Sequence, residues 1–202
     1  MTASLMENDL DPDPFVQFER WFEAAKAAQP VLPEGFTLAT ASADGRVSAR
    51  VCLLKGFDRH GFVFFTNYNS RKGSELHENP RASLCFWWPA LERQVRIEGA
   101  VVKTTTEESD AYFATRPRGS QLSAWASCQS EPIAGRGGLE ARFQEMQKSY
   151  CDHPIPRPPH WGGYRVIPVW IEFWQGREDR LHDRFAYRLR ESQDWVIERL
   201  SP

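Results

Sequence analysis

The chain has 202 residues, which favours one large domain over two, and its 41% hydrophobic and 26% charged residues are ordinary for a globular protein. Its 27 acidic residues against 25 lysines and arginines leave a formal net charge of −2, which argues against a surface built for nucleic acid. No segment approaches the ~18 apolar residues that cross a bilayer, and no apolar signal segment opens the chain. The four cysteines lack the spacing of a zinc site or a disulfide framework. We therefore expect a cytoplasmic protein with neither membrane nor nucleic-acid partners.

The N-terminal region predicts an arm followed by a helix. Residues 1–14 are acidic and end in Asp-Pro-Asp-Pro, which favours a flexible arm. Residues 15–28 show helical spacing of apolar side chains, and Pro30 and Pro33 are expected to end that helix. The apolar positions that recur at this spacing are Phe15, Phe18, Phe22 and Ala25.

The next segment changes to the alternation of strands. Extended runs are expected at 36–41, 46–55, 61–66, 81–88 and 92–103. The first two are joined through Ala43-Asp44-Gly45, a hairpin signal, and a short helix at 70–79 that stops at Pro80 interrupts the series. Closely spaced strands with short links indicate a mainly antiparallel barrel or a strongly curved sheet.

The second half alternates again between helices and strands. Thr105 and Glu108 have the spacing of a capping box that opens a helix ending near Arg116, and a further helix is expected at 139–150. Strand patterns return at 164–174, 183–189 and 195–199, after a proline-rich connector at 153–159. No repeat or linker marks a boundary, so we expect residues 15–202 to form a single α+β domain, a mainly antiparallel β-barrel with flanking helices.

Several familiar sites are absent from the sequence. It has no phosphate-binding glycine loop, no dinucleotide-binding glycine motif after a strand and no His-Glu-x-x-His motif. Its five histidines are too scattered to indicate a metal site. A phosphate-bearing ligand would therefore have to be held by cationic side chains and hydroxyls.

Two clusters of such cations lie in the first half of the chain. Arg50 and Lys55 fall at the ends of one expected strand, on opposite faces by simple alternation unless a bulge intervenes. Arg71 and Lys72 follow Ser70 at an expected helix start, where free backbone N–H groups and the helix dipole favour a phosphate. Taken alone, the Arg71-Lys72 pair is also consistent with a solvated helix start.

A third cluster lies in the second half. Tyr112 and Arg116 are four residues apart and so share a helix face, with the hydroxyl of Ser120 just beyond. Phenol, guanidinium and hydroxyl are the donors that a phosphomonoester dianion needs. The same pair could instead be a surface feature, and the charged run at 180–184 could be a strand edge. Composition and spacing thus indicate a possible phospholigand site on a barrel.

Seven strings of this sequence, in this order, resemble the pyridoxine 5′-phosphate oxidase family. They are Arg50-Val-Cys-Leu-Leu-Lys55, Phe65-Thr-Asn-Tyr-Asn-Ser-Arg-Lys-Gly73, Leu91-Glu-Arg-Gln-Val95, Tyr112-Phe-Ala-Thr-Arg-Pro-Arg-Gly-Ser120, Pro158-Pro-His-Trp-Gly-Gly163, Ile171-Glu-Phe-Trp-Gln-Gly176 and Arg180-Leu-His-Asp-Arg184. The resemblance covers residues 15–202 and includes the terminal Glu198-Arg-Leu-Ser-Pro202.

The resemblance implies a split β-barrel and a homodimer with active sites at the subunit interface. The residues that it implies for FMN are Arg50, Val51, Lys55, Phe65, Thr66, Arg71, Lys72, Gln94, Gln129, Ser130, Trp174 and Arg184. Those that it implies for the substrate are Lys55, Tyr112, Arg116 and Ser120 around its phosphate, with Arg180 and His182 over the pyridine ring as the catalytic pair.

The implied reaction oxidises pyridoxine or pyridoxamine 5′-phosphate to the aldehyde pyridoxal 5′-phosphate, with O2 as acceptor, H2O2 as product, ammonia released from the amine, and no metal. This chain departs from the family at Phe65, where a tyrosine is common, and in its short arm, which lacks the arginine- and tyrosine-bearing segment of many members. Two alternatives remain. One is a related oxidase of phenazine biosynthesis, and the other is a non-catalytic split-barrel protein that binds flavin or haem.

Overall fold

The computed structural model describes residues 4–29 and 31–202. The first three residues of the expected arm and Pro30 lie outside the described residues. Helices form at α1 (Pro14–Ala28), α2 (Arg71–Glu78), α3 (Thr106–Thr115), α4 (Arg118–Ala126) and α5 (Arg136–Ser149), with short 3-10 turns at η1 (Glu7–Asp9), η2 (Pro89–Leu91) and η3 (Glu178–Arg180). The strands are β1 (Gly35–Ala41), β2 (Val47–Leu53), β3 (Gly56–Asp58), β4 (Gly61–Asn67), β5 (Arg81–Trp88), β6 (Arg93–Lys103), β7 (Trp161–Gln175), β8 (Asp183–Leu189) and β9 (Trp195–Arg199).

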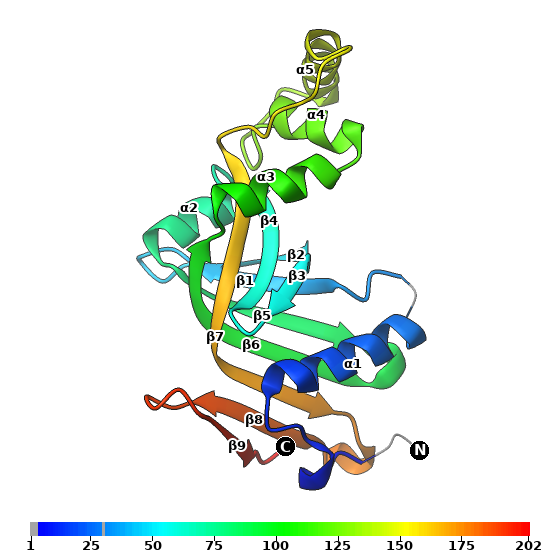
Figure 1. Ribbon diagram of the computed structural model, residues 1–202, viewed down its shortest axis with the longest axis vertical. Coiled ribbons are helices and arrows are strands. Elements are labelled where there is room, and N and C mark those ends of the chain that lie inside the picture. Colours follow the sequence, from blue (N-terminus) through cyan, green and yellow to red (C-terminus); the bar gives the residue numbers. More distant parts are fainter. Residues whose placement is uncertain (1–3, 30) are drawn as a thin grey trace.

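The described strands form one antiparallel sheet in the order β2-β1-β5-β6-β7-β4-β3, with β8 paired to β7 and β9 to β8. The sheet curls round its core (Figure 1), so the expectation of an α+β fold on a curved antiparallel sheet is confirmed. The 15-residue β7 pairs with two different strands along one of its edges. Its first part pairs with β4, and its last part pairs with β8. In Figure 1 it runs from the helices at one end of the molecule to β8 and β9 at the other.

Along its other edge β7 pairs with β6, and the register shifts once, between Glu98 and Gly99. A side chain at Gly99 would place its Cβ 2.0 Å from the carbonyl oxygen of Ile167, so the close approach of the two strands requires glycine there.

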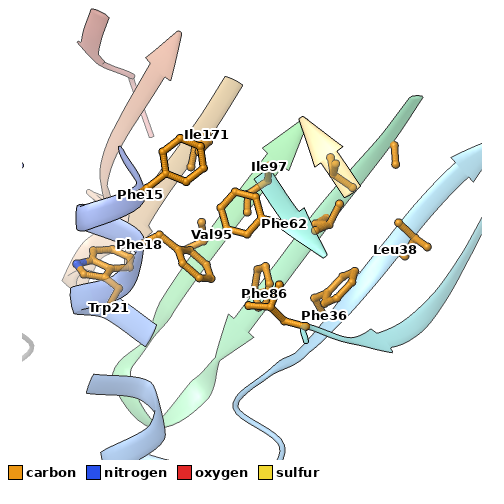
Figure 2. Packing of buried hydrophobic residues seen from close by; sticks show 14 of the residues in the cluster. Phe15, Phe18, Trp21, Phe36, Leu38, Phe62, Phe86, Val95, Ile97 and Ile171 are labelled. Atoms are coloured by element: carbon orange, nitrogen blue, oxygen red, sulfur yellow. The ribbon is translucent and has the colours of Figure 1, made fainter. Parts of the chain in front are cut away.

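Aromatic side chains fill the space between α1 and the sheet. Asp13 caps the helix by accepting a hydrogen bond from the backbone N–H of Phe15. Figure 2 shows Phe15 and Phe18 projecting from the helix toward the cluster of buried sheet residues. Trp21, on the same helix, packs on Phe173 of β7 with ring centroids 5.2 Å apart. Trp21 is buried, whereas the expected Phe22 is only partly buried. The apolar stripe is therefore wider than the sequence spacing indicated, because two adjacent aromatic residues both pack on the core.

The helices α3, α4 and α5 form a lobe at one end of the sheet (Figure 1). A second, smaller hydrophobic core packs these helices against the start of β7. The buried residues of this core are Phe113, Leu122, Ala124, Ile155 and Trp161. Thr105 and Glu108 make the expected capping box at the start of α3, with both reciprocal hydrogen bonds present. The sequence did not predict α4, which begins directly after the proline that ends α3.

The segment before α1 has defined contacts in the part that the structure describes. Leu5 is buried, and its backbone N–H donates to a carboxylate oxygen of Asp183. Arg199 of β9 forms an ion pair with Glu7 at 2.7 Å and another with Asp183 at 2.9 Å. The mobility expected for this arm stays a prediction. None of the described helices has the length and apolar content to cross a bilayer.

Candidate active site

A cavity of about 1250 Å³ lies between β2, β4 and the helical lobe. Single-ligand pockets usually measure about 300–1000 Å³, so this space is large enough for a cofactor and a substrate together. Of the residues that the sequence singled out, those that line it are Arg50, Val51, Lys55, Phe65, Thr66, Lys72, Tyr112, Arg116 and Gln129. Two separate parts of the chain, 50–72 and 112–129, thus converge on one space.

Arg50 and Lys55 face the same cavity, although simple alternation along one strand would have placed them on opposite faces. The strand β2 ends at Leu53, before Lys55 is reached. The backbone N–H of Lys55 donates instead to the carbonyl of Val63 on β4, which turns the chain toward that strand. The alternation rule therefore does not apply across this pair.

Thr66, Lys72 and Gln129 form one hydrogen-bonded group on the cavity wall. The ammonium group of Lys72 lies 3.2 Å from the Thr66 hydroxyl and 3.0 Å from Oε1 of Gln129. The Thr66 hydroxyl in turn lies 3.2 Å from the same Gln129 oxygen. Burial lowers the pKa of Lys72, so a bound anion would relieve the cost of keeping this cation in a partly desolvated place.

Ser70 caps α2, as its place in the sequence predicted, with its hydroxyl accepting from the backbone N–H of Gly73. Arg71 and Lys72 then begin the helix, but only Lys72 is among the described residues that line the cavity. The side chain of Arg71 is 62% exposed and its Nε donates to Glu75 at 2.9 Å. Arg50 also reaches Glu75, at 3.4 Å.

Three aromatic rings stack beside this group. The ring of Phe65 lies 4.0 Å from that of Tyr112 and 5.5 Å from that of Trp161, centroid to centroid, with interplanar angles of 13° and 10°. The stack joins the strand that carries Thr66 to the helix that carries Tyr112. Phe65, one of the positions at which this chain was expected to depart from the family it resembles, thus has a ring contact with Tyr112.

Arg116 follows α3 as its C-terminal cap and reaches the same cavity as Tyr112. Its guanidinium lies over the ring of Trp161, 4.6 Å from the centroid. Its Nη1 is buried and has no hydrogen-bond partner among the described residues, and burial lowers the pKa of the group. A buried guanidinium nitrogen with an unused donor favours an anionic ligand at this position.

Ser120 and Ser130 are not among the cavity-lining residues. Ser120 lies in the first turn of α4, where its backbone N–H donates to the carbonyl of Pro117. Ser130 has a left-handed backbone, with φ of 75°, and lines a neighbouring hollow of about 200 Å³ with Arg142.

The remaining predicted residues form a second group on the far half of the sheet. Gln94, Trp174 and Arg184 lie side by side on β6, β7 and β8, since Trp174 pairs with each of the other two. His182 packs on Trp174, with ring centroids 4.5 Å apart. Arg184 donates to the buried carboxylate of Glu172 at 2.7 Å. Of the described residues that line the large cavity, none belongs to this group.

The backbone holds His182 in a defined orientation. Its Nδ1 accepts a hydrogen bond from the backbone N–H of Arg177 at 3.1 Å. The neutral imidazole therefore carries its proton on Nε2. Arg180 is exposed and, like Asp179 before it, has a left-handed backbone, with φ of 62° and 56° respectively. A non-glycine residue rarely adopts this conformation, so the turn that carries Arg180 is sterically strained.

Sequence reasoning assigned no role to Trp161 or to the cavity face of α5. The string 158–163 contained Trp161, but its packing under Arg116 depends on how β7 meets α3, which no local pattern shows. Leu139 and Phe143 of α5 line the cavity and are four residues apart, a helical spacing that could have indicated an inward face. No group of three His, Cys, Asp or Glu side chains within the described residues could hold a metal ion.

Comparisons with known proteins identify the family of this chain. The family described as pyridoxamine 5′-phosphate oxidase matches residues 24–150, and the one described as the pyridoxine 5′-phosphate oxidase C-terminal dimerisation region matches residues 161–202. A pyridoxine/pyridoxamine 5′-phosphate oxidase of Paraburkholderia phymatum is 62% identical over 99% of this chain and 94% of its own. One of Nostoc sp. is 60% identical over 98% of this chain and 92% of its own.

Two solved structures share the fold. PhzG from Burkholderia lata, crystallised with tetrahydrophenazine-1-carboxylic acid, superimposes with a TM-score of 0.92 at 34% identity, over 100% of this chain and 99% of its own. An FMN-binding, pyridoxamine 5′-phosphate oxidase-related protein of Nostoc punctiforme gives 0.75 at 19% identity, over 96% and 100%. Both family matches and the full-length relatives lead to one conclusion: the chain belongs to the pyridoxamine 5′-phosphate oxidase family.

Proposed function

We propose that this protein is an FMN-dependent oxidase that converts pyridoxine or pyridoxamine 5′-phosphate into pyridoxal 5′-phosphate. The observation that carries the proposal is the convergence of two donor groups on one cavity, Lys72 with Thr66 and Gln129, and Arg116 with Tyr112. A cofactor and a substrate that each carry a phosphate ester need two such groups. The two alternatives, an oxidase of phenazine type and a non-catalytic flavin protein, need only one.

The residues present fit FMN. In this proposal Arg50, Arg71 and Lys72 hold its phosphate at the N-terminus of α2, where backbone N–H groups add to the positive charge. Thr66 and Gln129 offer neutral hydrogen-bonding groups next to Lys72. Val51, Lys55 and Phe65 line the space beyond. The partly desolvated Lys72 supports the assignment, because a phosphate would supply the counter-charge that it lacks.

Arg116 and Tyr112, with Lys55, are proposed to hold the substrate phosphate. Nη1 of Arg116, which has no hydrogen-bond partner in the part of the chain that the structure describes, is the donor that this ester would satisfy. Ser120 lies one short turn away and is proposed to add its hydroxyl. Trp161 fixes the plane of the Arg116 guanidinium, so its N–H donors would already be oriented when the ester binds.

The second group is proposed to complete the site from a second copy of the chain. Gln94, Trp174, Arg184, His182 and Arg180 do not line the cavity within one chain, and residues 161–202 match a dimerisation region. A two-fold dimer would apply the second group of each copy to the cavity of the other. The proposed functional unit is therefore a homodimer with two interface sites, and its cytoplasmic location stays a prediction.

Bound FMN would supply the redox chemistry, taking two electrons from the 4′-carbon of the substrate and passing them to O2 to give H2O2, and with the amine substrate water would complete the aldehyde and release ammonia. The side chains of this chain bind and orient. Arg116 and Tyr112 fix the phosphate end, while His182 presents Nε2–H and Arg180 its guanidinium toward the ring. Positioning of this kind can lower a reaction barrier by about 7–11 kcal/mol, so in this proposal acid–base catalysis by His182 is secondary.

The main alternative is an oxidase acting on phenazine precursors, favoured by the high TM-score of 0.92 to PhzG. The experiment is to purify the protein, record its flavin absorption spectrum, and measure H2O2 with pyridoxine phosphate, pyridoxamine phosphate and a reduced phenazine carboxylate. Turnover of the two phosphate esters, without turnover of the phenazine carboxylate, supports the proposal. Turnover of the phenazine alone contradicts it, and flavin binding without any turnover favours a non-catalytic protein.

A further inference from the structure

A carboxylate lies among the arginines of the proposed FMN phosphate site. Glu75, on the second turn of α2, is 5% exposed and accepts hydrogen bonds from the hydroxyls of Thr40 at 2.5 Å and Ser48 at 2.6 Å. Arg71 donates to its other oxygen at 2.9 Å, and Nη2 of Arg50 lies 3.4 Å away. Four side chains from β1, β2 and α2 thus meet on one buried carboxylate.

An acid at this position weakens the attraction between the site and an anion, so its presence needs a reason. Burying a carboxylate is costly unless it is paired and hydrogen-bonded, and here both of its oxygens are used. Although burial would raise the pKa of Glu75, its hydrogen bonds from Ser48, Thr40 and Arg71 and the charge of Arg50 lower that pKa to about 2. The group is therefore ionised at neutral pH.

The two arginines differ in what else holds them. Arg71 is 62% exposed and Glu75 is its one ion-pair partner among the described residues. Arg50 also contacts the hydroxyls of Thr40 and Ser48, the same two that donate to Glu75. Removing the carboxylate would therefore take away one ion-pair partner of Arg50 and would also free the two hydroxyls that Arg50 contacts. Long, flexible side chains that are fixed in advance lose less freedom when a ligand binds.

We propose that Glu75 is a positioning residue that holds Arg50 and Arg71 in place for the terminal phosphate of FMN. This inference rests on the proposed function, because it assumes that FMN is the cofactor. The carboxylate also offsets part of the repulsion between the two neighbouring guanidinium groups. Glu75 itself does not contact the cofactor in this arrangement.

The test compares FMN with riboflavin, which lacks the phosphate. Each is titrated into cofactor-free dimer and followed by quenching of flavin fluorescence, for the natural protein and for Glu75→Ala and Glu75→Gln. We expect Glu75→Ala to raise the Kd for FMN by about tenfold or more, since charge-assisted hydrogen bonds to phosphate are lost, and to leave the Kd for riboflavin within about twofold. Glu75→Gln keeps one acceptor oxygen, so its Kd for FMN should lie between that of the natural protein and that of Glu75→Ala.

Glu78→Gln is the matched control, because it removes one negative charge from the same helix at an exposed position. It should leave the preference for FMN over riboflavin unchanged. If Glu75→Ala does not unfold cooperatively, the near-isosteric Glu75→Gln carries the test. A loss of both ligands in parallel, or an undiminished preference for FMN, would overturn the positioning role. If the natural protein binds both ligands equally, the proposed phosphate site itself is wrong.

Discussion

The guanidinium carbon of Arg116 lies 4.6 Å from the ring centroid of Trp161, over the face of the indole. Trp161 is the first residue of β7 and is only 6% exposed, whereas Arg116 ends α3. The contact therefore fixes a cation from the helical lobe against the strand that runs through the whole sheet. Nη1 of Arg116 is buried and has no hydrogen-bond partner within residues 4–29 and 31–202, which is why we propose this pair for the substrate phosphate.

Arg116→Ala should separate substrate binding from cofactor binding. Losing the guanidinium should cost about 2 kcal/mol in binding of the ester, a rise of about 30-fold in KM for pyridoxine 5′-phosphate. FMN affinity should stay near that of the natural protein, because the phosphate of FMN is assigned to other side chains. Steady-state kinetics and a flavin titration measure the two effects. Loss of FMN with an unchanged KM would mean that the two phosphate sites are exchanged.

Trp161→Leu should act in the same direction as Arg116→Ala, and more weakly. A cation–π contact is worth about 1 kcal/mol, so KM should rise roughly fivefold. Trp161→Phe, which keeps a ring beneath Arg116, is the matched control and should retain most of the affinity. Thermal unfolding of both variants accounts for losses in the small core of the lobe. An equal rise of KM in the two variants would argue that packing, rather than the aromatic face, supports Arg116.

Changing Arg71 and Lys72 together to alanine should weaken FMN and leave the fold intact. Each charge-assisted bond to phosphate contributes about 1.5–3 kcal/mol, so the Kd for FMN should rise by about tenfold or more. We expect Lys72 to be the larger contributor, because it lines the cavity while Arg71 is 62% exposed. Fluorescence titration of each single variant would rank them. An unchanged Kd in the double variant would identify the pair as a solvated helix start.

The pKa of Glu75 predicts an acid-dependent loss of stability. Its folded pKa is lowered from 4.5 to about 2, so the ionised carboxylate stabilises the fold fully above its ordinary value and progressively less as pH falls toward about 2. Glu75→Gln has no group to titrate there. The difference in free energy of unfolding between the natural protein and Glu75→Gln should therefore shrink across this range. Urea denaturation measures it, and a constant difference would contradict the assignment.

The sequence predicted the elements of strong periodicity and missed those fixed by tertiary contacts. The spacing of Phe15 and Phe18 was sufficient for α1, and the Thr105–Glu108 pair was sufficient for the start of α3. It did not predict that Pro117 separates two helices, because α4 has no side-chain cap at its N-terminus. Lys55 was misplaced because the end of β2 depends on pairing with β1 and on the contact with β4.

In the candidate site, too, local features could be predicted from the sequence and long-range contacts could not. Cation clusters at 50–55, 71–72 and 112–116 were visible in the sequence, since charge and helical spacing are local properties. The stacking of Phe65 on Tyr112 joins residues from separate elements. Glu75 is one charged residue in a helix of charged residues, and only the fold brings Thr40 and Ser48 to its carboxylate. Such contacts are long-range and leave no local pattern.

In the proposed dimer, one copy supplies the cavity and its partner supplies the second group. Two impaired variants test this arrangement, assayed at low FMN and low substrate: Lys72→Ala with Arg116→Ala in one chain, and His182→Ala with Arg184→Ala in the other. In a heterodimer one site carries all four changes and the other carries none. Each variant alone should form impaired homodimers that elute as dimers, which is the control.

The measurement is peroxide-forming activity after the two variants are co-expressed or mixed and reassociated. Random pairing makes half of the dimers mixed, with one natural site in each, so activity should recover to about one quarter of that of the natural protein. FMN occupancy should recover alongside it. Activity that stays at the level of the separate variants, in a sample shown to contain heterodimers, would contradict an interface site and place all of the chemistry within a single chain.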